Sequence, residues 1–165
     1  MSNAMEITFT KLSLTHHRVD LVRDDGTRET AEFETRSAVP HDFIHYALES
    51  LAGLHSSVWG LLASGHSFAD LGVKAAMAGT VVPREEVIVS EMVAGALSSV
   101  AKGGVTNEAF LEVMQNAFGA FDLPVPAYLT HDFLNAFRER MRELMGYWKA
   151  VGRGEPMRLE WPAPR

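Results

Sequence analysis

The stretch Pro40-His41-Asp42-Phe43-Ile44-His45-Tyr46-Ala47-Leu48-Glu49 has the clearest two-sided pattern in this chain. On an α-helix, with about 100° between successive residues, its polar groups fall within an arc of roughly 100°. These groups are His41, Asp42, His45 and Glu49. The opposite side carries Phe43, Ile44, Ala47, Leu48, Leu51 and Leu54. We therefore predict a helix from about residue 39 to residue 55 whose apolar side, including Phe43, Ile44, Ala47 and Leu51, faces a core.

The polar side of this helix carries a pattern that is typical of metal sites. Two histidines four residues apart can bind one divalent ion from one helix face, and an acid between them can activate the bound water. His41, Asp42 and His45 have this spacing and resemble the HExxH motif of the zincin family, with Asp in place of Glu. The resemblance covers five residues. It implies His41 and His45 as zinc ligands and places Asp42 at the position of the general base.

A third ligand must complete the site. Glu49 follows His45 by four residues, but His41 and Glu49 lie about 12 Å apart along the helix axis. One ion therefore uses His45 with either His41 or Glu49, and the remaining ligand comes from elsewhere. Our candidates are His66, Asp70, His55 and His131, and we expect His66 to bind the ion with Asp70 orienting its ring. In this interpretation Asp42 or Glu49 transfers a proton and water is the nucleophile.

A second interpretation of the same helix needs no metal. Pro40 and Asp42 are typical of a first helical turn, and His45 with Glu49 would then be a surface pair. The sequence thus leaves two hypotheses open. The first is a small protein with a metal or acid/base site, a hydrolase that uses Zn²⁺ or another divalent metal. The second is a non-catalytic binding or oligomerisation protein with no metal site.

Composition restricts the classes of function. The chain has 165 residues, of which 47% are hydrophobic and 22% charged, values that are typical of a globular protein. A net charge of −6 makes nucleic acid an unlikely partner, and we expect an unknown small molecule or protein instead. The absence of cysteine leaves His, Asp and Glu as the metal ligands. With no signal peptide or membrane span in the sequence, we expect a cytoplasmic protein.

The remaining pattern predicts an α+β fold, in which a small N-terminal antiparallel β-hairpin or meander packs against a mainly α-helical body. Residues 1–4 look like an expression-vector remnant, and we expect residues 5–165 to form one globular domain. Residues 6–34 alternate as antiparallel strands, with a hairpin turn at Asp24-Asp25-Gly26-Thr27. We expect His16 and His17 to lie at a solvated hairpin end.

Helices are predicted after this sheet. Residues 59–66 are rich in Gly, Ser and other small residues, and we expect a loop there with a short helix near residues 67–76. We expect a longer helix at 84–102, and two more that begin at Thr106 or Asn107 and at Thr130. The last of these carries the apolar stripe Phe133, Phe137, Met141, Leu144 and Trp148, which forms either core or the interface of a homodimer. Residues 157–161 alternate again and are predicted to add an edge strand to the N-terminal sheet.

Overall fold

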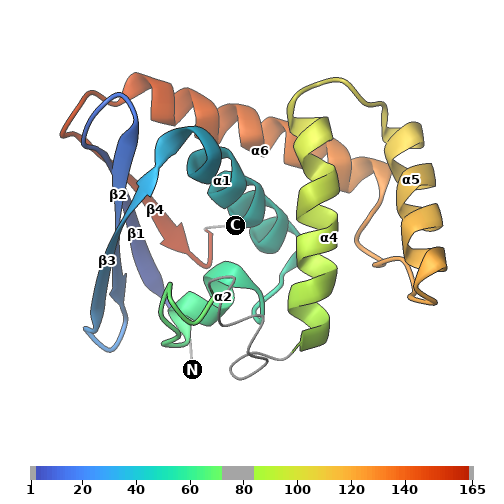
Figure 1. Cartoon of the computed structure of the whole chain (residues 1–165), viewed down its shortest axis with the longest axis horizontal. Helices are drawn as coiled ribbons and strands as arrows, with labels where there is room; N and C mark the ends of the chain where they lie inside the picture. Colours follow the sequence, from blue (N-terminus) through green and yellow to red (C-terminus); the bar gives the residue numbers. More distant parts are fainter. Residues whose placement is uncertain (1–2, 72–83, 164–165) are drawn as a thin grey trace.

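The structure, a computed structural model, describes residues 3–71 and 84–163 (Figure 1). Four strands form one antiparallel sheet in the order β3-β2-β1-β4. Their bounds are β1 Met5–Lys11, β2 His16–Arg23, β3 Arg28–Glu34 and β4 Pro156–Trp161. The predicted hairpin is confirmed, because Gly26 between β2 and β3 has a φ of 84°. The predicted edge strand is also confirmed, since β4 pairs with β1 at the edge of the sheet.

Five helices are described, and they contain more of the described residues than the four strands do, which confirms the predicted α+β fold. They are α1 Thr35–Ala52, α2 Val58–Ala63, α4 Arg84–Ala101, α5 Asn107–Ala120 and α6 His131–Ala150. Figure 1 shows α1 and α6 beside the sheet, α4 against α1 on the side away from the sheet, and α5 farthest from it. No helix formed by the described residues is long and apolar enough to span a membrane.

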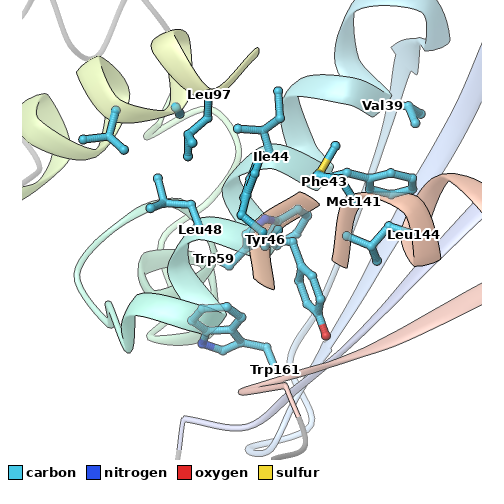
Figure 2. Packing of buried hydrophobic residues seen from close by; sticks show 14 of the residues in the cluster. Val39, Phe43, Ile44, Tyr46, Leu48, Trp59, Leu97, Met141, Leu144 and Trp161 are labelled. Atoms are coloured by element: carbon cyan, nitrogen blue, oxygen red, sulfur yellow. The ribbon is translucent and has the colours of Figure 1, made fainter. Parts of the chain in front are cut away.

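The core lies between the sheet, α1 and α6 and extends to α4. From the sheet, Phe9 and Val19 are fully buried as register partners on β1 and β2. From α1, Phe43 packs edge to face on Phe9, with ring centroids 5.3 Å apart. Figure 2 shows α1, α4 and α6 supplying side chains to this one cluster. Phe137 of the apolar stripe on α6 is fully buried, so the stripe belongs to the core of the monomer.

Helix α1 begins earlier than predicted. It starts at Thr35, because the carboxylate of Glu34 caps it by accepting hydrogen bonds from the backbone N–H groups of Arg36 (3.1 Å) and Ser37 (3.0 Å). Pro40 therefore lies inside the helix and not in its first turn. The helix ends where Gly53 adopts a φ of 68°, a left-handed conformation that glycine adopts without a steric penalty.

Three further expectations need correction. Leu51 is 36% exposed, so the prediction that it faces the core is wrong. His17 is fully buried and packs among aromatic rings, including Phe9 and Trp148, so it does not lie at a solvated hairpin end. The segment after residue 57 is not all loop, because α2 occupies Val58–Ala63. Residues 67–71 of the predicted helix at 67–76 contain a turn, and the rest of that helix lies outside the described residues.

Replacing Phe137 by Ala should lower the free energy of unfolding by about 3–5 kcal/mol, the usual cost of deleting a buried aromatic ring. Phe121→Ala is the matched control, because Phe121 is 69% exposed and its loss should change stability by less than about 0.5 kcal/mol. Equilibrium denaturation of both variants measures the difference. Equal losses would contradict the burial of the α6 stripe.

Candidate metal centre

The centre begins with two ionisable side chains that are completely buried on α1. His45 and Glu49 have exposed fractions of 0%, and residues of α2 and α4 contact them. The Nδ1 atom of His45 lies 3.1 Å from Oε2 of Glu49 and donates a hydrogen bond to it. The interpretation of this pair as a surface pair is therefore wrong. Buried ionisable groups are costly unless they have partners, so the partners of each atom decide what the pair does.

The second oxygen of Glu49 binds the start of α2. Oε1 accepts hydrogen bonds from the backbone N–H groups of Trp59 (2.9 Å) and Gly60 (3.4 Å). Ser57, at the N-cap position, makes no side-chain cap of its own, so Glu49 supplies the missing acceptor. Gly60 is required at this contact, since a Cβ atom there would lie 2.1 Å from the carbonyl oxygen of His55. Glu49 is thus fixed from both sides.

The other ring nitrogen of His45 has no hydrogen-bond partner. Nε2 is buried and lies 3.1 Å from Oε1 of Glu91 on α4, but the ring and the carboxylate are not oriented for a hydrogen bond. Glu91 is 47% exposed, so it reaches the buried histidine from the surface. A buried nitrogen that faces a carboxylate without a hydrogen bond is an arrangement that a bound cation would satisfy.

His41 completes the group one helical turn before His45. Its Nε2 lies 3.7 Å from Oε2 of Glu91, and its Nδ1 lies 3.7 Å from Oδ1 of Asp42. The side chain of His41 is 54% exposed. One ligand atom from each of His41, His45 and Glu91 lies within 4.8 Å of the others. Among the described residues, these three form the group that has the composition and spacing to bind a metal ion.

The carboxylates strongly perturb the histidines. Contacts with Asp42 and Glu91 raise the pKa of His41 to about 10. Burial opposes protonation of His45, yet Glu49 and Glu91 outweigh it and raise the pKa of this ring. Burial raises the pKa of Glu49, whereas the two imidazoles beside Glu91 lower the pKa of its carboxyl group. Without a metal, the cluster is therefore a set of ion pairs that links α1 to α4.

The structure brings together some of the site residues that we predicted and not others. His41, Asp42, His45 and Glu49 all meet at the centre. His66 is not a member of the three-residue group; its Nδ1 lies 4.0 Å from Oδ2 of Asp70, and its carbonyl oxygen accepts a hydrogen bond from Arg23.

Two other candidate third ligands also lie outside the group. His55 packs edge to face on Trp161, with ring centroids 6.4 Å apart. The Nδ1 atom of His131 lies 3.8 Å from a carboxylate oxygen of Glu108. The third member of the group is Glu91, which was not among our candidates.

Sequence reasoning missed Glu91 because it lies on a different helix, 84–101, with no motif that connects it to His45. One signal was present. Glu91 is the single charged residue in the otherwise uncharged stretch 87–97, which reads VIVSEMVAGAL. An isolated charge within an apolar helical run is rarely left inside a fold without a partner.

Comparison with protein-family models, with curated proteins and with solved structures found no match. We therefore infer the function of this protein from the geometry of the centre.

Replacing Glu49 by Gln should lower the free energy of unfolding of the metal-free protein by about 1–3 kcal/mol, because the amide cannot accept hydrogen bonds from both His45 and the start of α2. Glu91→Gln is the matched control, since the carboxylate of Glu91 is 47% exposed and water can replace its contacts. Urea denaturation should show a clearly smaller loss for the control. Equal losses would mean that the burial of Glu49 does not govern the stability of the centre.

Proposed function

We propose that the protein binds one divalent metal ion, Zn²⁺ or an ion of similar preference, through His41, His45 and Glu91, and that it acts as a metal-dependent hydrolase. The observation that carries the proposal is the buried Nε2 atom of His45, which has no hydrogen-bond partner and faces a carboxylate. Two histidines and one glutamate are a donor set that catalytic zinc sites use.

The distances between the ligand atoms support this donor set. Bonds of 2.0–2.2 Å in a tetrahedral site place neighbouring ligand atoms about 3.4 Å apart. The carboxylate oxygens of Glu91 lie 3.1 Å from Nε2 of His45 and 3.7 Å from Nε2 of His41, on either side of that value. His41 and Glu91 are each about half exposed, so small side-chain rotations are enough to close the site around an ion.

A carboxylate at the far nitrogen of each histidine supports the proposal independently. Metal-binding histidines nearly always donate their second ring N–H to a carboxylate, a carbonyl or water, which fixes the orientation of the ring. Glu49 lies at Nδ1 of His45, and Asp42 lies at Nδ1 of His41. We therefore assign Glu49 and Asp42 as positioning residues, in place of the proton transfer that the sequence led us to expect.

Hydrolysis is the chemistry that this arrangement favours. Three protein ligands leave a fourth position on a tetrahedral ion, and a water molecule bound there has its pKa lowered to about 7. Solvent can reach that position, because His41 and Glu91 are both partly exposed. A structural metal site would instead be closed by a fourth protein ligand.

The second hypothesis, a non-catalytic interaction protein, is supported by the electrostatics of the metal-free centre. The pKa of His41 is raised to about 10, so His41 and Glu91 already form a stable ion pair that links α1 and α4. In this alternative the cluster stabilises the packing of the helices and binds no metal. Metal titration separates the two hypotheses.

Calorimetric titration of the protein, freed of any histidine tag, should show one equivalent of Zn²⁺ bound. His45→Ala should abolish binding, and Glu49→Gln should weaken it by about 10–100-fold, as loss of an orienting carboxylate does. His131→Ala is the control, because His131 lies outside the group and its loss should leave the affinity unchanged. Chelator-sensitive hydrolysis of an ester, amide or phosphoester panel, restored by Zn²⁺, then tests the reaction.

Two results would overturn the proposal. One is the absence of binding to the wild-type protein at micromolar metal, and the other is a binding constant that His45→Ala leaves unchanged. Either result would favour the ion-pair interpretation. Stoichiometric binding without hydrolysis would remove the hydrolase and leave the metal site.

A further inference from the structure

A pocket of about 890 Å³ opens beside the metal centre. It lies between the N-terminal half of α1, the C-terminal half of α4 and the second half of α6, which Figure 1 shows converging. His41 is one of its lining residues, so the pocket adjoins the centre. The volume falls in the range of about 300–1,000 Å³ that is usual for small-molecule sites.

The Asp, Glu, Lys and Arg side chains that line this pocket all have one sign of charge. Its lining includes five basic side chains and no Asp or Glu; the five are Arg36, Lys102, Arg138, Arg142 and Lys149. The chain as a whole has a net charge of −6, so the concentration of positive charge is local and opposite to the average. A concave surface that is lined by one sign of charge attracts ligands of the other sign.

Two of these cations already donate hydrogen bonds to the protein backbone. Arg138 donates to the carbonyl oxygens of Val100 (3.2 Å) and Val105 (2.6 Å), at and just beyond the end of α4. Arg142 donates through Nε to the carbonyl oxygen of Arg138 (3.4 Å), which leaves its two terminal guanidinium nitrogens for a ligand. In the described part of the chain, no ion pair involves Arg36, Lys102, Arg142 or Lys149.

The floor of the pocket is apolar. Ile44, Ala94 and Met141 are at most 5% exposed and contribute to its walls. Gly95 on α4 leaves room, since a Cβ atom added there would meet nothing within 4 Å. The pocket therefore combines an apolar floor with basic side chains, and a ligand that fits both has an apolar body and an anionic head group.

We infer that this pocket binds a small amphipathic anion, an alkyl or acyl chain that ends in a carboxylate or a phosphate. The inference rests on the proposed function only in treating such ligands as the substrates of the hydrolase. The alkyl or acyl chain of the ligand contacts Ile44, Ala94 and Met141. The anionic head group pairs with Lys149 and with the terminal guanidinium nitrogens of Arg142. Binding itself needs no metal.

Calorimetric titration of the metal-free protein with octanoate and octyl phosphate tests this inference, with octanol and octyltrimethylammonium as the neutral and cationic comparisons. We expect saturable binding of one anion per chain, and the tighter of the two anions identifies the head group. The neutral and cationic compounds should bind about tenfold or more weakly, because they lack the charge interaction. Equal affinity for octanol and the anions would overturn the inference, as would no binding of either anion.

Variants locate the binding site. Gly95→Leu should abolish binding by filling the pocket, without a loss of thermal stability, because Leu is a better helix former than Gly. Gly119→Leu makes the same change on α5, away from the pocket, and should leave binding unchanged. Arg142→Gln combined with Lys149→Gln should weaken binding by about tenfold, whereas Arg140→Gln, which does not line the pocket, should not. Unchanged binding in Gly95→Leu would overturn the inference.

The His45→Ala variant separates failure of this inference from failure of the proposed function. Its octanoate affinity should equal that of the wild-type protein, because the buried ring of His45 does not line the pocket. If zinc fails to bind while octanoate binds with the expected variant pattern, the ligand inference is supported and the metal-dependent hydrolase is rejected. If zinc binds through His45 and neither anion binds, the metal site is supported and the amphipathic ligand is rejected.

Discussion

The hydrogen bond between His45 and Glu49 is the interaction on which the functional half of this structure depends. Both side chains are completely buried, and an ionisable pair in an apolar interior is tolerated only when its remaining polar atoms have partners. The carboxylate meets this requirement by binding the backbone N–H groups of Trp59 and Gly60, which fixes the short helix α2 against α1. The imidazole has a hydrogen-bond partner at Nδ1 only, since Nε2 faces Glu91 without a hydrogen bond. We propose that the metal binds at Nε2.

This constraint also links the helices. Glu91 reaches the centre from α4, and one residue before it, Ser90 is hydrogen-bonded to Ser57 at the start of α2 (2.5 Å). The same contact region therefore joins α1, α2 and α4. It lies beside the basic pocket, so a metal-bound water and an anionic ligand would meet where His41 is exposed. The packing of α1 on α4 forms the proposed metal centre, and α6 supplies the remaining wall of the adjacent pocket.

Local sequence patterns predicted the four strands and the four longer helices of this fold, but not α2, and they predicted part of the centre. The alternation of residues 6–34 and the Asp25-Gly26 turn predicted the hairpin, and the i,i+4 spacing predicted that His41 and His45 share a helix face. Glu91 was not predictable in this way, because it meets His45 only through the packing of α4 on α1. The burial of His17 was not predictable for the same reason, since the aromatic rings around it come from β1, β3 and α6. Sequence periodicity shows which residues lie on the same face of a helix or strand. Tertiary packing determines which other elements cover that face.

We propose that Nε2 of His45 is a metal ligand and that Glu49 fixes the orientation of this ring. Anomalous diffraction at the zinc absorption edge, from crystals of the protein with one equivalent of Zn²⁺, would locate the ion. We expect one zinc peak bonded to His41, to Nε2 of His45 and to a carboxylate oxygen of Glu91, at about 2.0–2.2 Å from each, with Glu49 still bound to Nδ1 of His45. Zinc found only at other histidines, with Nε2 of His45 left facing Glu91 as in the metal-free protein, would contradict it.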